Sequence, residues 1–396
     1  MFLDTREEIV KNSKIEGLIT PKYDGLSISN IGSFILDNFN VQNQLTKLKI
    51  VKSLNLDRKR KVVLLLIDAL GFKLLNFAKR KTHLEAFEEI EKNGILSILT
   101  SVFPSTTSTA LPSIYTGSAP SEHGVLGYRF YAKEFGDIIN PLFEKLSVDR
   151  NSRIRYDANW LIPNKTIFEY LNDANIPNYS LLKNEYLSST FDRAVYRGSK
   201  EIGYITLSDL LFHIEEQLKL DAVFINAYWW SVDALSHHYG PYSSAVINEI
   251  KMLDLFLKEL IKVIDKDTLL IITADHGQIE SIPNTVLDLS KMEASKNILL
   301  PITDVRAPYL YTNGKLDKKE FESFKNLLIM EKDEVFKKGL FGEEEKFKDR
   351  IGDLVILIKD GSTISYISDP NEVSLVGKHG NLTEEEMFVP LMLYYR

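Results

Sequence analysis

A short apolar run that leads into two metal-ligating side chains constrains this chain more than any other stretch. Residues 268–272 read Thr-Leu-Leu-Ile-Ile, which is typical of a β-strand buried on both faces of a parallel sheet. Asp275, His276 and Gly277 follow the run. Neighbours on a regular strand point to opposite faces, so the two side chains can share a ligand only if the chain turns. A turn at Gly277 would bring them together at the carboxyl end of the strand. The alternative is a core strand that ends in a polar turn.

The same pattern occurs nearer the start of the chain. Residues 61–71 form an apolar run that ends at Asp68, with Gly71 close behind. A carboxylate at the end of a buried strand is costly unless it is paired or bound to a cation. Further strands are expected at 94–103 and 221–226, and helices at 72–92 and 243–265. The alternation predicts an α/β fold with a largely parallel sheet and a metal site at the carboxyl ends of its strands.

The regular alternation stops after residue 278. Three elements are expected in the following region: a strand at 307–312, a charged helix near 317–349 and a strand at 353–359. They predict a small α+β cap subdomain inserted into the main sheet domain. The expected boundaries are 1–285 for the first part of the main metallohydrolase domain, 286–365 for the insertion and 366–396 for the return of the main domain.

Composition excludes several classes of protein. The 396 residues include no cysteine, which rules out disulfides and thiolate metal sites. A net charge of −7 without a long basic block argues against stable binding to nucleic acid or to an anionic membrane. The first residues lack the features of a signal peptide, and no apolar run approaches the roughly 20 residues that span a bilayer. We therefore expect a cytoplasmic protein, and the sequence leaves its oligomeric state open.

Five hydroxyl residues in succession, 105–109, follow the strand expected at 94–103. Serine and threonine are favoured helix N-caps, so the run is consistent with simple capping. The alternative is a nucleophile at a helix N-terminus, where backbone N–H groups and the helix dipole favour a phosphate. His123 lies in a turn at 120–124 and is interpreted as structural.

Three further side chains are candidate metal ligands. Asp233 and His237 are spaced i, i+4, so on a helix they share one face and can hold one cation. The alternative is a solvated polar helix face. His379 lies between Gly377 and Gly380, where backbone freedom can aim an imidazole at a site. Taken alone, His379 is better interpreted as a histidine of a surface loop.

As an ordered set, seven of these residues resemble the motifs of the alkaline phosphatase superfamily. The nucleotide pyrophosphatase/phosphodiesterase branch is the better match, with phosphoglycerate-mutase-like relatives at the C-terminal motif. The residues are Asp68, Thr107, Asp233, His237, Asp275, His276 and His379, in segments at about 60–130, 220–280 and 375–396. The resemblance implies a three-layer α/β/α sandwich around a largely parallel sheet.

The resemblance also implies two metal sites. Asp233, His237 and His379 would hold one metal; Asp68, Asp275, His276 and the Thr107 oxygen would hold the other. Nitrogen and carboxylate ligands suit Zn²⁺, with Mn²⁺ or Fe as alternatives. Thr107 matches the nucleophile of the family, and Thr106 is the alternative because the run of hydroxyls permits a slip of one residue.

The implied activity is metal-dependent hydrolysis of a phosphodiester or nucleotide pyrophosphate through a phosphothreonine on Thr107. The substrate would be a small phosphate ester or nucleotide. Other readings are a phosphomonoesterase or phosphomutase of the same superfamily, or a catalytically silent binding module. Two departures from the family pattern matter. Tyr128 stands where these phosphodiesterases carry an asparagine that contacts phosphate, and Ser231-Val232 replaces Glu-Pro before Asp233.

Overall fold

One eight-stranded sheet organises the protein in this computed structural model, which describes residues 1–53, 57–147, 153–187, 189–314, 316–367 and 370–396. In spatial order the strands are β1 (Phe2–Leu3), β3 (Ile95–Thr100), β18 (Phe388–Tyr394), β10 (Thr268–Thr273), β2 (Lys61–Ile67), β9 (Val223–Trp229), β7 (Asn178–Lys183) and β8 (Lys200–Tyr204). Neighbouring strands are parallel except where β18 pairs with β3 and β10. The predicted largely parallel sheet is confirmed.

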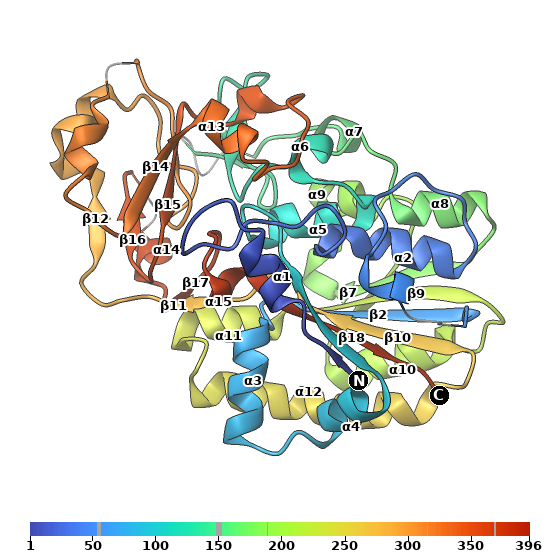
Figure 1. The fold of residues 1–396 in the computed structure, drawn as a ribbon. Helices are drawn as coiled ribbons and strands as arrows, with labels where there is room; N and C mark the ends of the chain where they lie inside the picture. The colour runs from blue at the N-terminus through green and yellow to red at the C-terminus, as the bar shows by residue number, and fades with distance from the viewer. Residues whose placement is uncertain (54–56, 148–152, 188, 315, 368–369) are drawn as a thin grey trace.

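Helices cover both faces of this sheet, which completes the predicted three-layer sandwich (Figure 1). One layer contains α3 (Phe72–Lys81), α4 (Glu85–Asn93), α10 (Leu207–Gln217), α11 (Ser231–Tyr239) and α12 (Ser244–Val263). The opposite layer contains α2 (Ile31–Asn38), α5 (Thr107–Thr116), α8 (Ile167–Asp173) and α9 (Thr190–Val195). Because the central strands are buried on both faces, they have the continuous apolar sequences seen in β2 and β10.

Strand register brings the two carboxylates to one level of the sheet. Leu66 of β2 pairs with Thr273 of β10 and, on the other side, with Tyr228 of β9. Asp68 and Asp275 each lie two residues beyond this paired level. Both therefore emerge at the carboxyl ends of neighbouring parallel strands, which is where such sheets place their sites.

The helix expected over 72–92 is in fact two helices. α3 ends at Lys81, and Thr82 has an extended backbone with φ −153°. α4 then starts against α12, because the Asp254 carboxylate accepts the backbone N–H groups of Ala86 and Phe87, both at 3.0 Å. An acceptor from a distant helix therefore sets the start of α4. The helix expected over 243–265 is confirmed as α12.

The insertion contains two small sheets. β13 (Tyr309–Leu310), β15 (Leu354–Ile358) and β14 (Leu327–Glu331) form an antiparallel sheet, and β12 (Val286–Asp288) pairs in parallel with β16 (Thr363–Ser365). They enclose a second hydrophobic core that includes Leu289, Ile298, Phe321, Ile356 and Ile364. These strands lie beyond one end of the main sheet (Figure 1). The exact domain boundaries at 285 and 366 stay a prediction.

The prediction of a charged helix near 317–349 is wrong. That stretch holds a 3₁₀ turn (Lys318–Phe321), strand β14, a short helix α13 (Lys332–Lys337) and another 3₁₀ turn (Lys348–Arg350). The apolar run Leu-Leu-Ile-Met at 327–330 pairs with β15 along its whole length. Pairing with a strand far along the chain therefore decides the structure there, not the local charge pattern.

Short elements complete the chain. The strands are β4 (Phe130–Ala132), β5 (Asp137–Asn140), β6 (Lys145–Leu146), β11 (Ile279–Glu280) and β17 (Gly377–Lys378). The helices are α1 (Arg6–Lys11), α6 (Pro120–His123), α7 (Ala158–Leu161), α14 (Pro370–Ser374) and α15 (Glu384–Met387). Among the described residues, no helix combines the length and the apolar character needed to cross a bilayer.

Candidate metal centre

Asp68, Asp275 and His276 converge at the ends of β2 and β10. The Nε2 atom of His276 lies 3.5 Å from Oδ1 of Asp68 and 3.4 Å from Oδ2 of Asp275. All three side chains are almost completely buried. β10 ends at Thr273, so Asp275 and His276 lie beyond the regular strand and point to the same place. The predicted convergence is confirmed.

Tight backbone turns produce this convergence. Ala69 adopts a left-handed conformation with φ 61° directly after Asp68. A turn was the expected reason for a glycine at position 277, but the structure shows another reason. A Cβ at this position would lie 2.0 Å from the Glu385 carbonyl oxygen. Only glycine allows the chain behind His276 to pass this close to the segment that carries α15.

Hydrogen bonds occupy one oxygen of each carboxylate and leave the other without a partner. Oδ1 of Asp275 accepts the backbone N–H groups of Ala69 (3.2 Å) and His276 (3.0 Å). Oδ2 of Asp68 accepts a hydrogen bond from the Tyr228 hydroxyl. Oδ1 of Asp68 and Oδ2 of Asp275 are buried and have no hydrogen-bond partner among the described residues. A bound cation would give both of these buried oxygens a partner.

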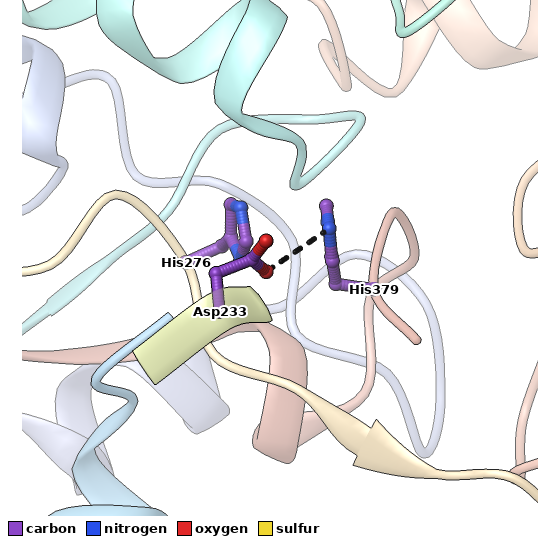
Figure 2. Close-up of side chains that lie close together, drawn as sticks. All are labelled: Asp233, His276 and His379. Carbon is purple, nitrogen blue, oxygen red and sulfur yellow. Dashed lines mark ion pairs between the residues drawn. The ribbon is translucent and has the colours of Figure 1, made fainter. Parts of the chain in front are cut away.

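A second group of ligands lies beside the first. α11 places Asp233 and His237 on one face, with His237 Nε2 3.3 Å from Asp233 Oδ1. The loop after β17 brings His379 to the same place, with its Nε2 3.6 Å from Asp233 Oδ1 and 3.2 Å from His237 Nε2. Figure 2 shows Asp233 and His379 facing each other, with His276 close by. The structure therefore brings all of these predicted ligands together.

The three imidazoles present the same nitrogen to the carboxylates. Their Nδ1 atoms lie near backbone carbonyl oxygens: His237 at 2.7 Å from Gly377, His379 at 2.8 Å from Ser105 and His276 at 3.1 Å from Gly277. A carbonyl oxygen only accepts, so each Nδ1 donates and carries the proton. Each Nε2 then has a free lone pair directed at the carboxylates, as in metal-bound histidines.

The two groups of ligands are contiguous. The rings of His276 and His379 stack with centroids 3.7 Å apart and planes 15° from parallel. Ligand atoms of Asp233, His276 and His379 also lie within 4.8 Å of one another, as do those of Asp68, Asp275 and His276. His276 belongs to both of these groups and thus joins them into one cluster of candidate ligands.

Burial controls the charges of this centre. It raises the pKa of Asp68 well above its usual value, with the nearby Asp275 and Asp233 charges adding to the effect, and it raises the pKa of Asp275 to about 7. Burial lowers the pKa of His276 to about 4 and that of His379 well below its usual value. Crowded carboxylates and neutral imidazoles together fit a divalent metal such as Zn²⁺.

Asp233 differs from the other carboxylates of the centre. Burial by itself would raise its pKa, but His237, His379 and His276, which attract the carboxylate whenever they are protonated, outweigh burial and lower the pKa. The amide of Gln278 donates to the same Oδ1 atom. Asp233 is therefore kept ionised, which is the form that binds a metal.

Thr107 is the hydroxyl that reaches this centre. It is the first residue of α5, and its Oγ1 lies 3.1 Å from His276 Nε2 and 3.4 Å from Asp68 Oδ2. The Thr106 hydroxyl instead contacts Ser108 (3.0 Å) and Thr109 (3.4 Å) within the same turn. Of these two threonines, only Thr107 contacts side chains of the candidate ligand groups, and its role as nucleophile stays a prediction.

Two residues that contact the ligands were not predicted. Tyr228, near the end of β9, donates its hydroxyl to Asp68, and Gln278 donates to Asp233. Their only sequence signal is position: Tyr228 lies at the end of a buried strand, and Gln278 directly follows the Asp-His-Gly turn. In metal sites, residues that hydrogen-bond a ligand in this way orient it.

His123 and Tyr128 lie outside the ligand groups. His123 is fully buried, accepts the Val125 backbone N–H at Nδ1 (3.2 Å) and contacts the Ser113 hydroxyl (2.8 Å), which agrees with its predicted structural role. Burial raises the pKa of the Tyr128 hydroxyl to about 12.

Two curated proteins with related sequences are named as GPI ethanolamine phosphate transferases. The chain is 26% identical over 226 residues to GPI ethanolamine phosphate transferase 3 of Eremothecium gossypii, and 26% identical over 233 residues to that of Schizosaccharomyces pombe. Each match covers 55% of this chain but only 21% and 22% of those proteins. The chain thus spans less than a quarter of the relatives it matches.

Solved structures share the fold. Murine ectonucleotide pyrophosphatase/phosphodiesterase 5, solved as an inactive variant with AMP, superposes with a TM-score of 0.66 at 18% identity, covering 85% of this chain and 88% of that one. Phosphonoacetate hydrolase from Sinorhizobium meliloti, in complex with phosphonoacetate, gives 0.62 at 18% identity, covering 85% and 90%.

A family profile identifies the chain more directly. The profile described as type I phosphodiesterase/nucleotide pyrophosphatase matches residues 62–382, a span that contains both ligand groups and Thr107. That family supports phosphoryl-ester hydrolysis as the general class of reaction. With the profile extending over most of its length, this chain belongs to the type I phosphodiesterase/nucleotide pyrophosphatase family.

Proposed function

We propose that this protein is a two-metal phosphodiesterase or nucleotide pyrophosphatase that acts through a phosphothreonine on Thr107. One observation carries the proposal: the Thr107 hydroxyl lies 3.1 Å from His276 Nε2, and this nitrogen faces two buried carboxylate oxygens that have no hydrogen-bond partner among the described residues. A nucleophile that touches a metal-ligand group is the arrangement expected for covalent phosphoryl transfer. A silent binding module would have no need to keep this hydroxyl among the ligands.

The residues divide the work of the reaction. Asp233, His237 and His379 would hold one divalent metal, and Asp68, Asp275 and His276 the other, with Zn²⁺ as the metal that the ligand set suits best. Bound metals would lower the pKa of the Thr107 hydroxyl and neutralise charge on the phosphoryl oxygens. The N-terminus of α5 supplies backbone N–H groups and a favourable dipole for the same negative charge.

The proposed reaction has two displacements. In the first, Thr107 Oγ1 loses its proton and bonds to phosphorus, while the bond from phosphorus to the leaving oxygen breaks and that oxygen takes up a proton. In the second, water attacks phosphorus, the bond to Thr107 breaks and the hydroxyl is restored. The net result is hydrolysis of one phosphate ester bond to an alcohol and a phosphate monoester.

A second function is favoured by the sequence relatives. The curated relatives are named ethanolamine phosphate transferases. In a reaction of that kind, the phosphoryl group on Thr107 would pass to an acceptor alcohol instead of to water. The family name and the small ligands of the structural neighbours, AMP and phosphonoacetate, support hydrolysis of a small substrate. A phosphomonoesterase or phosphomutase remains the alternative within the superfamily.

The proposal is tested at the nucleophile. The purified protein is assayed for metal content, then for hydrolysis of bis-p-nitrophenyl phosphate and p-nitrophenyl phosphate, with and without an added alcohol. Thr107→Ala should bind two metals per chain yet lose activity by about 10³-fold or more, because the covalent route is lost. Thr107→Ser should retain part of the activity.

Thr106→Ala is the matched control, since it removes the neighbouring hydroxyl that contacts only Ser108 and Thr109. It should cost far less. If Thr107→Ala kept full activity, direct attack by water would replace the phosphothreonine mechanism. A faster rate on the monoester, or transfer to the added alcohol in preference to water, would favour the alternative functions.

A further inference from the structure

The run of five hydroxyl residues at 105–109 is only partly explained by the proposed reaction. Thr107 contacts the candidate metal ligands, and Thr106 forms its contacts within its own turn. Ser105 opens the run and is fully buried, so its hydroxyl depends on partners within the protein. Those partners lie in a distant part of the chain, on the loop that carries the ligand His379.

The Ser105 hydroxyl forms two hydrogen bonds with this loop. It donates to the Asn381 carbonyl oxygen at 2.7 Å and accepts the Gly380 backbone N–H at 3.1 Å. A serine hydroxyl has a single hydrogen to donate, and here that hydrogen is used. Because the side chain is also buried, Ser105 is not placed to attack a substrate. Its contacts instead hold the loop.

The backbone of Ser105 contacts the ligand itself. Its carbonyl oxygen accepts the Nδ1–H of His379 at 2.8 Å, which leaves Nε2 to face Asp233. A hydrogen bond at the second ring nitrogen orients a metal-bound histidine. Ser105 therefore holds the ring of His379 through its carbonyl oxygen and the two following residues through its hydroxyl.

The same serine stands two positions before the proposed nucleophile. Thr107 is the first residue of α5, and its Oγ1 lies 3.1 Å from His276 Nε2. The backbone N–H of Thr106 donates to the Pro104 carbonyl oxygen at 2.9 Å, which closes a tight turn centred on Ser105. A shift of Ser105 would therefore also move Thr107.

The start of this segment is fixed by another serine. Ser101 is also fully buried, and its hydroxyl donates to the Asp275 carbonyl oxygen at 2.6 Å. The segment 101–107 is thus tied at one end to the turn that carries His276 and near its other end to the loop of His379. Because the Ser101 bond is made to the first ligand group, the position of Thr107 relative to His379 depends on Ser105.

We propose that Ser105 is a positioning residue, which sets the distance between the Thr107 hydroxyl and the metal that His379 would hold. The inference rests on the proposed function, since it assigns a role within that reaction. Ser105 does not touch the substrate in this role and acts through the two residues that it positions. Its loss should therefore change metal affinity and kcat more than KM.

Ser105→Ala removes the hydroxyl and leaves the backbone carbonyl in place. The metal that is lost in His379→Ala should bind about tenfold more weakly in this variant, measured by competition with a chromophoric chelator. With saturating metal, kcat and kcat/KM for bis-p-nitrophenyl phosphate should both fall about tenfold or more, with KM little changed. Ser105→Thr, which restores a hydroxyl, should recover most of both losses.

Ser113→Ala is the matched control. Ser113 is equally buried, and its hydroxyl donates to the Thr109 carbonyl oxygen at 3.0 Å and lies 2.8 Å from His123 Nε2. Each variant loses one buried hydroxyl with two partners, so urea unfolding should show similar losses of stability. Ser113→Ala should nevertheless keep the metal affinity and kcat of the wild type, because its partners lie outside the ligand groups.

Equal metal affinity and kcat in Ser105→Ala and Ser113→Ala would overturn the proposal, and so would a Ser105→Thr variant as impaired as Ser105→Ala. If the wild type hydrolyses no ester, the proposed function fails, and metal affinity alone decides the role of Ser105. If the wild type binds no metal either, hydrogen exchange at the Gly380 amide decides, because that N–H donates to Ser105. Faster exchange in Ser105→Ala than in Ser113→Ala supports the positioning role, and equal exchange refutes it.

Discussion

The Nε2 atoms of His237 and His379 lie 3.2 Å apart, although both rings place their proton on Nδ1. Two lone pairs that face each other at this distance repel. Oδ1 of Asp233, which lies 3.3 Å and 3.6 Å from the two nitrogens, adds negative charge to the same point. A divalent cation bound by all three atoms removes this repulsion, so we treat these residues as one separable metal site.

Replacing His379 should therefore remove one metal and leave the other. His379→Ala deletes one of three protein ligands of this site, while Asp68, Asp275 and His276 are untouched. Elemental analysis after dialysis should give about one metal equivalent per chain instead of two, with an unchanged circular dichroism spectrum. Phosphodiester hydrolysis should fall steeply, because one of the two metals is lost.

The control for this variant is His238→Ala. His238 is the next residue after His237 on α11, but it is exposed and lies outside the ligand groups. Its loss should leave both metals and the activity intact. Two metal equivalents and full activity in His379→Ala would show that the assignment of this site is wrong.

Tyr228 should tune metal affinity without being a ligand. Its hydroxyl donates to Oδ2 of Asp68 and leaves Oδ1 to face His276. Tyr228→Phe removes this restraint and nothing else, so affinity for the metal bound by Asp68 should fall about 10- to 100-fold. Competition with a chromophoric chelator measures this directly, and the affinity of the His237–His379 site should not change.

Tyr115→Phe provides a matched comparison. Tyr115 is also fully buried, and its hydroxyl donates to Asn226 at 2.8 Å instead of to a metal ligand. Both variants lose one buried hydroxyl, but only Tyr228→Phe should weaken metal binding. Equal affinities in the two variants would mean that Asp68 is held in place without Tyr228.

The sequence predicts where several candidate ligands lie because three of them, Asp68, Asp275 and His276, follow the ends of apolar strands. β2 and β10 are apolar throughout, so a carboxylate immediately beyond each strand stands out. The i, i+4 spacing of Asp233 and His237 likewise survives in α11. These signals depend on local periodicity, and the family resemblance adds the order in which they occur.

Features that depend on distant partners were not predictable in this way. The carboxylate of Asp254 starts α4, and the pairing of β14 with β15 replaces the helix expected near 317–349. The need for Gly277 arises from the close passage of Glu385, which no local pattern reveals. In each case tertiary contact overrides local preference.

His123 should make the free energy of unfolding depend on pH, and this effect does not involve the metal centre. Burial lowers its pKa to about 3, whereas the unfolded chain should titrate near about 6.5. The resulting stability is therefore fully present above pH 6.5 and is lost progressively as the pH falls toward 3. Between pH 7 and pH 5 the expected loss is about 2 kcal/mol.

Urea unfolding of the metal-free protein at these two pH values measures the effect. His123→Gln should remove it, so the pH-dependent loss in the wild type should exceed that in the variant by about 2 kcal/mol. Using metal-free protein at both pH values separates this group from metal release. Identical pH dependence in the two proteins would show that His123 does not stay neutral in the folded state.

The buried pair of Arg306 and Glu386 connects the insertion to the main domain. Nε and Nη2 of Arg306 donate to the two Glu386 oxygens, each at 3.0 Å, and neither side chain is exposed. Nη1 donates to the carbonyl oxygens of Asp360 (2.7 Å) and Ser362 (2.6 Å). Glu386 lies in α15, and its own carbonyl oxygen accepts the Gly277 N–H behind His276.

Arg306→Met should therefore destabilise the protein by about 3–5 kcal/mol, because it leaves the Glu386 carboxylate buried and without its cation. Arg306→Lys keeps the charge but cannot form the paired contact, so its cost should be intermediate. Chemical unfolding of metal-loaded protein measures both. The exposed pair Lys262–Glu259, 2.6 Å apart, is the control, and Lys262→Met should change stability by no more than about 0.5 kcal/mol. If Arg306→Met were as mild as that control, the insertion would be held by its apolar contacts and not by this ion pair.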